Sequence, residues 1–143
     1  MVDRGLPISW AAPAARVVTA APNFAYEWAA QRGVPAQTHP DDLCNVVMII
    51  GSEPVSMDAI ESFSAAFAPQ GLPPTAFMPS YGIAEATLFV ASIAPNAEPT
   101  AIYVDRAELM AGRVVPVESD APTAVVQVSC GQVARSEWAV IVD

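Results

Sequence analysis

The chain has 143 residues, of which 53% are hydrophobic and 15% are charged. This length suits one domain with a hydrophobic core, and the apolar content excludes an intrinsically disordered tail. The formal net charge of −9 and the pI of about 4.3 argue against binding to nucleic acid or to anionic membranes, because phosphate recognition needs clustered basic residues. All six basic residues are Arg and none is Lys, which limits the chemistry that the chain can perform alone.

The cysteines and the apolar runs indicate a soluble protein in a reducing compartment. Cys44 and Cys130 are far apart, in apolar surroundings, and we expect both to be buried, reduced thiols. The longest strongly apolar runs, residues 46–50 and 86–94, are much shorter than a membrane span, and the N-terminus shows no signal-peptide pattern. We therefore expect a cytoplasmic protein with no membrane span.

An Ala/Pro-rich segment, residues 1–15, is expected to be irregular. The next region, residues 16–97, alternates short β-branched or apolar runs with helical patterns. The predicted strands cover residues 16–20, 45–50 and 75–78, and the predicted helices cover residues 23–32, 56–67 and 84–92. Asn23 and Ser56 are the expected helix caps, and Gly33 is expected to end the first helix. The order strand–helix–strand–helix–strand–helix predicts an α/β fold with a parallel sheet and crossover helices.

The chain changes character in residues 98–143. Val-rich runs separated by turn residues predict short β-hairpins, interrupted by a short helix over residues 105–110. The predicted strands are residues 100–104, 113–117, 124–129 and 138–142. We therefore divide the chain into the irregular segment 1–15, the α/β subdomain 16–97 and the β-rich region 98–143.

Two turns that follow predicted strands are candidate ligand sites. Gly51, Ser52, Glu53 and Pro54 come directly after the apolar strand, where ligands of open α/β sheets bind. The alternative is an ordinary strand-to-helix turn with a solvated Glu53.

The second turn holds Ser80, Tyr81 and Gly82, with Glu85 shortly after it. In the functional interpretation, Tyr81 stacks on a base and Glu85 binds Mg²⁺. In the alternative, Tyr81 packs against the protein and Glu85 complements a helix dipole. Because both turns follow strands of one predicted sheet, a shared ligand crevice is favoured.

Other residue patterns are less informative. At helical spacing, Phe24 and Trp28 are more typical of a core than of a ligand wall. His39 lies between polar and proline residues and is expected at the surface. The sequence has no nucleophile elbow and no phosphate-binding loop ending in Gly-Lys.

Four segments, in order along the chain, resemble the fatty acyl-AMP ligases of the adenylate-forming ligase superfamily. They are Ala-Ala-Pro-Asn-Phe-Ala-Tyr-Glu at 20–27, Gly-Ser-Glu-Pro-Val-Ser at 51–56, Pro-Ser-Tyr-Gly-Ile-Ala-Glu-Ala-Thr-Leu-Phe at 79–89, and the stretch 129–142. The resemblance implies an N-terminal-domain subdomain of such a ligase. Its implied nucleotide-binding residues are Gly51, Ser52, Glu53, Pro54, Ser80, Tyr81, Gly82 and Ala84. It also implies acyl-binding residues Asn23 and Phe24, and Glu85 as the Mg²⁺ ligand.

The resemblance further implies a reaction and its partners. A long-chain fatty acid attacks ATP to give an acyl-adenylate for lipid or polyketide synthesis, with ATP/AMP and Mg²⁺ as cofactors and an acyl carrier protein of a polyketide synthase as acceptor. Residues 98–127 match the position of the insertion typical of acyl-AMP rather than acyl-CoA ligases. The family's phosphate loop, ribose-binding Asp and catalytic Lys have no counterpart here, so we expect a middle portion of the enzyme that is inactive without the missing ligase parts. The alternatives are a non-catalytic adenine-nucleotide-binding module and a subunit that completes a split enzyme.

Overall fold

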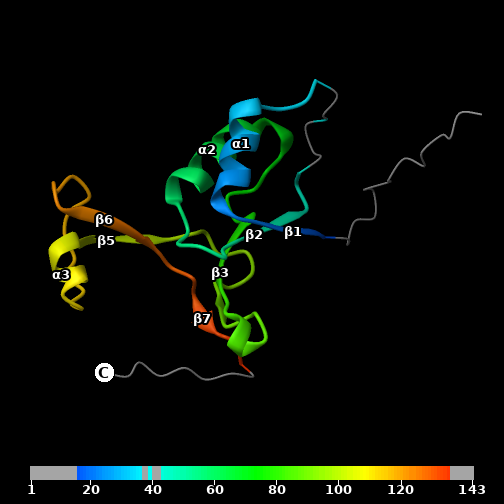
Figure 1. Cartoon of the computed structure of the whole chain (residues 1–143). Coiled ribbons are helices and arrows are strands. Elements are labelled where there is room, and N and C mark those ends of the chain that lie inside the picture. The colour runs from blue at the N-terminus through cyan, green and yellow to red at the C-terminus, as the bar shows by residue number, and fades with distance from the viewer. Residues whose placement is uncertain (1–15, 37–38, 40–42, 136–143) are drawn as a thin grey trace, which may run out of the picture.

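The computed structural model describes residues 16–36, 39 and 43–135. The predicted irregular segment 1–15 and the predicted strand 138–142 lie outside these residues. Three strands form the parallel part of a five-stranded sheet, namely β1 (Val17–Ala21), β2 (Val46–Ile50) and β3 (Phe77–Tyr81). Two short strands, β4 (Ala91–Ser92) and β7 (Gln132–Val133), extend it antiparallel in the order β1-β2-β3-β4-β7 (Figure 1). The predicted α/β fold with a parallel sheet is confirmed.

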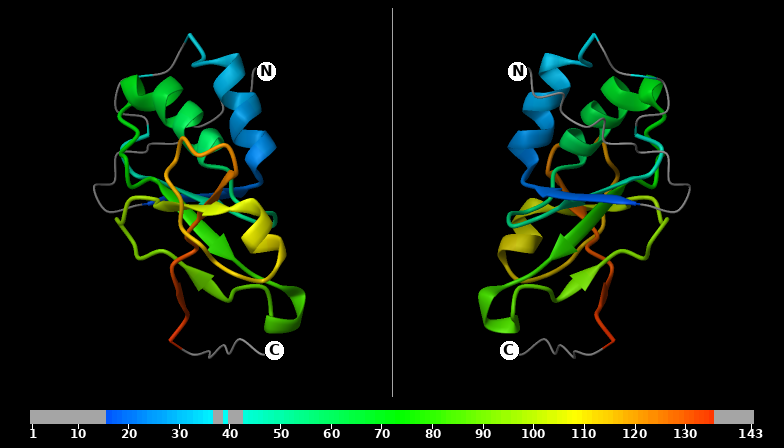
Figure 2. Two further views of the ribbon diagram at one scale, coloured as in Figure 1. Left: turned by 90° about the vertical axis from the view of Figure 1, so that its left-hand side faces the viewer. Right: turned by 90° about the vertical axis from the view of Figure 1, so that its right-hand side faces the viewer.

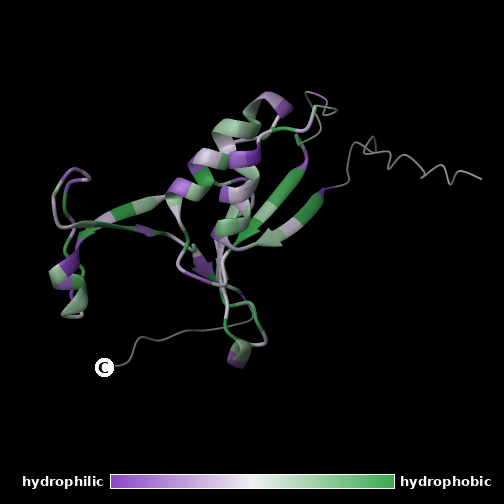
Figure 3. Ribbon diagram, turned by 45° about the horizontal axis from the view of Figure 1, so that its top comes forward, coloured by the Kyte–Doolittle hydropathy of each residue, from purple (hydrophilic) through white to green (hydrophobic). Residues whose placement is uncertain are grey.

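Two crossover helices, α1 (Asn23–Arg32) and α2 (Met57–Phe67), pack together over one face of the sheet, and the short 3₁₀ turn η1 (Ala68–Gln70) continues α2 (Figure 2). Met48 and Ile50 of β2 are buried, whereas Ile49 between them stays partly exposed. A wholly apolar strand of a parallel sheet is typically buried on both faces, but within the described residues only the helix-covered face of β2 is fully buried. Figure 3 shows the predominantly hydrophobic β1 and β2 beneath helices of mixed hydropathy.

The centre of the core is a cluster of aromatic rings. The ring of Tyr26 meets that of Phe77 edge-on at a centroid distance of 4.9 Å, and Phe63 contacts both at 5.4 and 5.6 Å. Edge-to-face packing of this kind adds to the hydrophobic gain from burial. Three segments far apart in the sequence, in α1, α2 and β3, are held together in this way.

The buried aromatic residue of α1 is not one of those predicted. Phe24 and Trp28 are 68% and 56% exposed, so their expected place in the core is wrong. They lie one turn apart on the outer side of the helix, where the Arg32 guanidinium stacks over the Trp28 ring at 3.7 Å. Tyr26 is buried instead because its hydroxyl donates to the Ile49 carbonyl at 3.0 Å, which satisfies its polar end.

The helix ends agree with the sequence in two of three cases, Ser56 and Gly33. Ser56 caps α2 by accepting from the Ala59 N–H at 3.2 Å, and Gly33 ends α1 with a positive φ of 71°. The prediction of Asn23 as a side-chain cap is wrong, because Asn23 is already the first residue of α1 and Pro22 precedes it. Asp105 caps the short helix α3 (Arg106–Met110), as described below.

The predicted helix over residues 84–92 does not form. A 3₁₀ turn, η2 (Ala84–Ala86), is followed by Thr87 and Leu88 with positive φ values of 55° and 87°. The chain then reverses into β4, which pairs antiparallel with β3 through Ser80 and Ser92. Thr, Phe and Val in this stretch have lower helix propensity than Ala, and strand pairing with β3 overrides the apolar pattern.

The β-rich region forms a separate two-stranded sheet of β5 (Ala101–Asp105) and β6 (Ala124–Val128), with α3 between them (Figure 1). These elements confirm the predicted strands at 100–104 and 124–129 and the short helix. The predicted strand at 113–117 is reduced to one isolated bridge between Val104 and Pro116. Two backbone hydrogen bonds, from the Asp105 N–H to the Val115 carbonyl at 2.9 Å and from the Val117 N–H to the Tyr103 carbonyl at 3.0 Å, hold this segment against the edge of β5 opposite β6.

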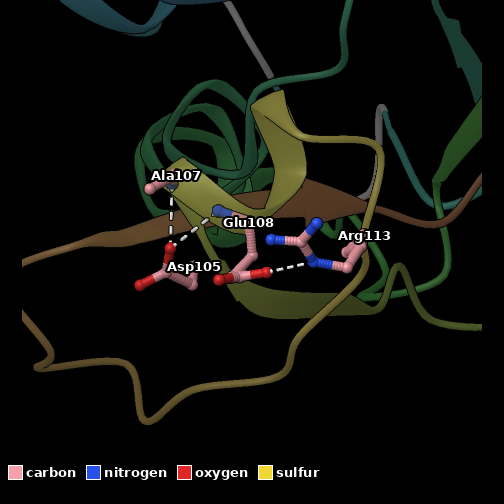
Figure 4. Close-up of polar contacts among 4 residues, drawn as sticks. All are labelled: Asp105, Ala107, Glu108 and Arg113. Carbon is pink, nitrogen blue, oxygen red and sulfur yellow. Dashed lines mark hydrogen bonds and ion pairs between the residues drawn. The ribbon is translucent and has the colours of Figure 1, made fainter.

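The start of α3 is held by one carboxylate (Figure 4). The Asp105 Oδ1 accepts from the backbone N–H groups of Ala107 at 2.8 Å and Glu108 at 3.0 Å. Its Oδ2 accepts from the Thr123 hydroxyl at 2.6 Å, and this bond is the main reason that the Asp105 pKa is lowered. Arg113, which follows α3, pairs with the carboxylate of Glu108 in the first turn of the same helix. Asp105 thus connects α3 with the segment that leads into β6.

The cysteines differ from expectation. Cys44 is exposed in the turn before β2, and Cys130 is half-buried after β6; both are free thiols. The expectation that Cys44 is buried is wrong, because the apolar run that suggested it begins only at Val46. His39 is exposed, as predicted.

Candidate functional site

The candidate site lies where β2 and β3 end. Ile50 and Pro79 are paired across these two parallel strands, so the turns that follow the strands emerge side by side. A Cβ atom on Gly51 would lie 2.5 Å from the Ser80 carbonyl oxygen, so only Gly allows the strands to approach here. The structure therefore brings together the two turns that the sequence predicted as one crevice.

Gly82 allows a second close approach. A Cβ atom at this position would lie 1.7 Å from the Leu88 carbonyl oxygen, which leaves no room for any side chain. The segment that replaces the predicted helix therefore folds back directly onto the Tyr81–Gly82 turn. The backbone N–H of Val90 donates to the Tyr81 carbonyl at 3.0 Å and fixes the fold-back.

Two pockets open on either side of this turn. Pocket 1 has a volume of about 330 Å³ and is lined mostly by apolar side chains. Its walls come from the ends of β1 and β2, the two turns and the fold-back segment: Ala20, Ala21, Pro22, Ile49, Gly51, Ser52, Ser80, Tyr81, Gly82, Leu88 and Phe89. This volume lies at the lower end of the range for small-molecule sites.

Pocket 2 has a volume of about 340 Å³ and lies between the two turns and the end of β6. Its walls are Ser52, Glu53, Pro54, Val55, Ser80, Tyr81, Gly82, Val126, Gln127, Val128 and Cys130. Ser52, Ser80, Tyr81 and Gly82 line both pockets, and the Tyr81 side chain is 50% exposed. A ring that lines two pockets and is half accessible can stack on a planar ligand.

The first turn is tied to the start of α1. The Glu53 carboxylate accepts from the Asn23 backbone N–H at 2.8 Å, so Glu53 is not the freely solvated residue of the alternative interpretation. The Asn23 side chain donates to the Pro54 carbonyl at 2.8 Å and accepts from the Ser56 N–H at 2.9 Å. Ser52, within the turn, has a positive φ of 66°, a conformation that costs free energy in a non-glycine residue. These bonds hold the turn in a conformation that the local sequence alone disfavours.

The other predicted site residues lie outside both pockets. Asn23 and Phe24 lie at the start of α1, next to Pro22 of pocket 1 but not among its walls. Ala84 and Glu85 lie in the exposed turn η2. In the part of the chain that the structure describes, no group of three or more His, Cys, Asp or Glu side chains could hold a metal ion.

Sequence reasoning missed several residues of the pockets. Ala21 and Pro22 could have been found, because they follow a strand neighbouring β2 and therefore reach the same edge of the sheet. No sequence signal places Leu88, Phe89 or the β6 residues beside Tyr81.

Cys130, which follows β6, is a wall of pocket 2, and burial raises the pKa of its thiol. No helix among the described residues has the length and apolarity needed to cross a membrane.

The known proteins that this chain resembles in sequence and in structure include fatty-acid-activating ligases. No protein-family model matches the chain. The chain is 52% identical over 128 residues to the long-chain-fatty-acid–AMP ligase FadD32 of Mycolicibacterium smegmatis and 57% identical over 127 residues to that of Mycobacterium marinum. These matches cover 88% and 87% of this chain and 20% of each relative. A crystal structure of a fatty acyl-adenylate ligase from L. pneumophila, in complex with acyl adenylate and pyrophosphate, superposes with a TM-score of 0.72 at 31% identity, covering 82% of this chain and 21% of that one.

The parallel sheet and its crossover helices match the N-terminal domain of adenylate-forming ligases. Within that class, the chain is a homologue of a segment of the long-chain fatty-acid–AMP ligases. It spans about 20% of the length of the curated relatives that it matches.

Proposed function

We propose that this chain provides the adenylate-binding crevice of an enzyme that activates long-chain fatty acids as acyl-adenylates. The observation that carries the proposal is the half-exposed Tyr81 between the glycine turns at the ends of β2 and β3. The identity with fatty-acid–AMP ligases supports the reaction class. Because the chain spans 20% of those relatives, the complete activity is proposed for this segment together with the remaining ligase parts.

In this proposal the adenine base binds in pocket 2 and stacks on Tyr81. The tight turns at Gly51 and Gly82 allow the backbone to approach the nucleotide, and Ser52, Glu53, Pro54 and Ser80 complete the walls of the pocket. Ala84 lies two residues after Gly82, in the turn η2. In this proposal it contacts the sugar-phosphate part of the nucleotide rather than the base.

Glu85 fits the role of a Mg²⁺ ligand only in a limited sense. It is one exposed carboxylate, and protein-bound Mg²⁺ commonly uses one or two carboxylates and takes its other ligands from phosphates and water. A bound Mg²⁺ would neutralise charge on the nucleotide phosphates, while Glu85 holds its carboxylate at the exposed turn beyond the Tyr81 crevice.

Pocket 1 suits the apolar chain of a fatty acid. Its walls are mostly hydrocarbon, and Ala21 and Pro22 lead directly into Asn23 and Phe24. Phe24 is largely exposed two residues beyond Pro22, and in this proposal it covers the bound acyl chain. An acyl carrier protein of a polyketide synthase is the acceptor that the family resemblance suggests, and this part of the proposal rests on the resemblance alone.

The 143-residue polypeptide should not complete the reaction alone. Adenylation builds negative charge on phosphate oxygens and needs cationic groups to stabilise it. The sequence has no Lys, and no basic residue is among the walls of either pocket. Fatty-acid-dependent release of pyrophosphate from ATP should equal a blank without protein, and clear turnover would contradict this expectation.

Nucleotide binding is the direct test of the crevice. NMR titration of the polypeptide with AMP should give a dissociation constant on the order of millimolar, because the base is held without a phosphate cradle. Tyr81→Ala should weaken binding about tenfold or more, since base–aromatic stacking contributes about 1–3 kcal/mol, and Tyr81→Phe should retain most of the affinity.

Trp28→Ala is the matched control, because Trp28 is an exposed aromatic residue outside both pockets. It should leave AMP affinity unchanged. Micromolar ATP binding that persists in Tyr81→Ala would place the nucleotide elsewhere and overturn the proposal.

A further inference from the structure

Pockets 1 and 2 share four of their walls, namely Ser52, Ser80, Tyr81 and Gly82. If the base of an acyl-adenylate lies in pocket 2 and its acyl chain in pocket 1, the phosphate that joins them must lie at these shared walls. No basic residue is among the walls of either pocket, so the side-chain donors available to the phosphate oxygens here are hydroxyl groups.

The side chain of Ser80 lies on the face of the sheet that carries pocket 1. Ile50 and Pro79 are paired and buried on the helix-covered face. Ile49 and Ala20 are paired one residue earlier, so their side chains point to the opposite face, and both residues line pocket 1. Because Ser80 directly follows Pro79, its side chain points to the same face as that of Ile49.

Ser92 of β4 lies directly opposite Ser80. The Ile93 N–H donates to the Pro79 carbonyl at 3.3 Å, so backbone hydrogen bonds flank this pair, an arrangement that brings opposite side chains close together. The two hydroxyl oxygens are 3.1 Å apart. Ser92 is also paired with Gln132 of β7, so strands on both sides fix its backbone. The sheet therefore holds the Ser92 hydroxyl beside the wall that the two pockets share.

The two hydroxyl groups have acceptors for both of their protons. The Ser80 Oγ lies 3.0 Å from the Met78 carbonyl oxygen, and the Ser92 Oγ lies 3.2 Å from the Ile93 carbonyl oxygen. Each hydroxyl has one proton to donate and lone pairs that accept, and its proton rotates to suit its surroundings. When Ser80 turns its proton toward a ligand, its oxygen can accept from Ser92. An accepted hydrogen bond polarises a hydroxyl and strengthens the bond that it donates.

We propose that the Ser80 hydroxyl donates a hydrogen bond to the phosphate that joins the two parts of the acyl-adenylate, and that Ser92 is a positioning residue for Ser80. This inference rests on the proposed function, because it requires the base in pocket 2 and the acyl chain in pocket 1. It gives a role in ligand binding to Ser92, which is a wall of neither pocket.

The test compares AMP with adenosine, which lacks the phosphate but has the same base for Tyr81. The ratio of the adenosine dissociation constant to the AMP dissociation constant isolates the phosphate contact, and Ser→Ala variants leave the net charge unchanged. In NMR titrations of the 143-residue chain, Ser80→Ala should lower this ratio about three- to tenfold, the change expected from one hydrogen bond. Ser62→Ala is the matched control, because the Ser62 hydroxyl also donates to a backbone carbonyl but lies outside both pockets, and it should keep the ratio.

The role of Ser92 is tested through its dependence on Ser80. Ser92→Ala should lower the ratio about twofold, Ser92→Thr should keep it because a hydroxyl remains, and adding Ser92→Ala to Ser80→Ala should lower it no further. A further loss in the double variant, or no loss in Ser92→Ala, would overturn the positioning role of Ser92.

An unchanged ratio in a Ser80→Ala variant whose NMR spectrum shows that it is folded would overturn the inference as a whole. If binding of both ligands still depended on Tyr81 in that case, the proposed function would stand. If binding of neither ligand depended on Tyr81, the proposed function and this inference would both fail.

Discussion

The backbone N–H of Asn23 donates to the carboxylate of Glu53 at 2.8 Å, and this bond joins the first turn of α1 to the turn that follows β2. A carboxylate at a helix N-terminus satisfies an otherwise unpaired N–H and interacts favourably with the helix dipole. The Glu53 side chain, from the turn after β2, therefore caps the N-terminus of α1, which has no side-chain cap from its own segment. The same contact sets the position of the turn that lines pocket 2.

Asn23→Ala should loosen this turn. The side chain of Asn23 makes two hydrogen bonds, to the Pro54 carbonyl and from the Ser56 N–H, and both are lost in the variant. Because the bonds lie near the surface, we expect unfolding free energy to fall by about 1–2 kcal/mol, measured by urea denaturation. AMP affinity should fall as well. Gln31→Ala, an exposed substitution in the same helix, should change neither quantity, and equal effects of the two variants would contradict the role given to Asn23.

Gly82→Ala should disrupt the crevice. The added methyl group would collide with the Leu88 backbone, so the fold-back segment must move away from Tyr81. The comparison is Gly112→Ala, where a methyl group meets nothing within 4 Å and only the positive φ of 75° is unfavourable. We expect a cost of about 1 kcal/mol for Gly112→Ala and a larger one for Gly82→Ala, with AMP binding lost only in the latter. Similar AMP affinities for both variants would show that the fold-back is not needed for binding.

The fold should lose stability in strong base through Tyr26. Burial raises the pKa of Tyr26 to about 12, from an ordinary value near 10. A raised pKa means that the protonated side chain contributes its full stability below pH 10, and that this contribution is lost as the pH rises toward 12. The loss should reach about 2 kcal/mol.

The sequence makes this measurement unusually clear. The chain has no Lys to titrate in the same range, and Tyr26 is one of only three tyrosines. Urea unfolding of the unaltered chain should show that the free energy of unfolding falls between pH 9 and 12. The Tyr26→Phe variant should be less stable at neutral pH, but its free energy of unfolding should fall less over this pH range. An identical pH profile for both proteins would mean that Tyr26 is not coupled to folding.

Much of the α/β subdomain follows from local patterns. The β-branched and apolar runs predicted β1 and β2, but they placed β3 at residues 75–78, whereas it runs over Phe77–Tyr81. The caps and glycines predicted the bounds of α2 and the end of α1. The turns at Gly51 and Gly82 could be assigned to one crevice because parallel strands present their carboxyl ends at the same edge of a sheet. The roles of the individual residues in binding stay predictions until the titrations are done.

Tertiary contacts decided the rest. An apolar Ala-rich pattern favoured a helix over residues 84–92, but pairing of Ser92 with Ser80 on β3 gave a 3₁₀ turn and a strand. In α1, Phe24 and Trp28 are four residues apart, a spacing that is typical of the buried face of a helix. Tyr26 is buried instead, because its ring fits between Phe63 and Phe77. The sequence by itself determined the strands, the helices with local caps and the turns between them, because these depend on neighbours a few residues apart. Only the tertiary structure decided which aromatic ring fills the core, which residue caps α1 and that β6 lines pocket 2 together with Tyr81, because each of these depends on residues brought together from distant parts of the chain.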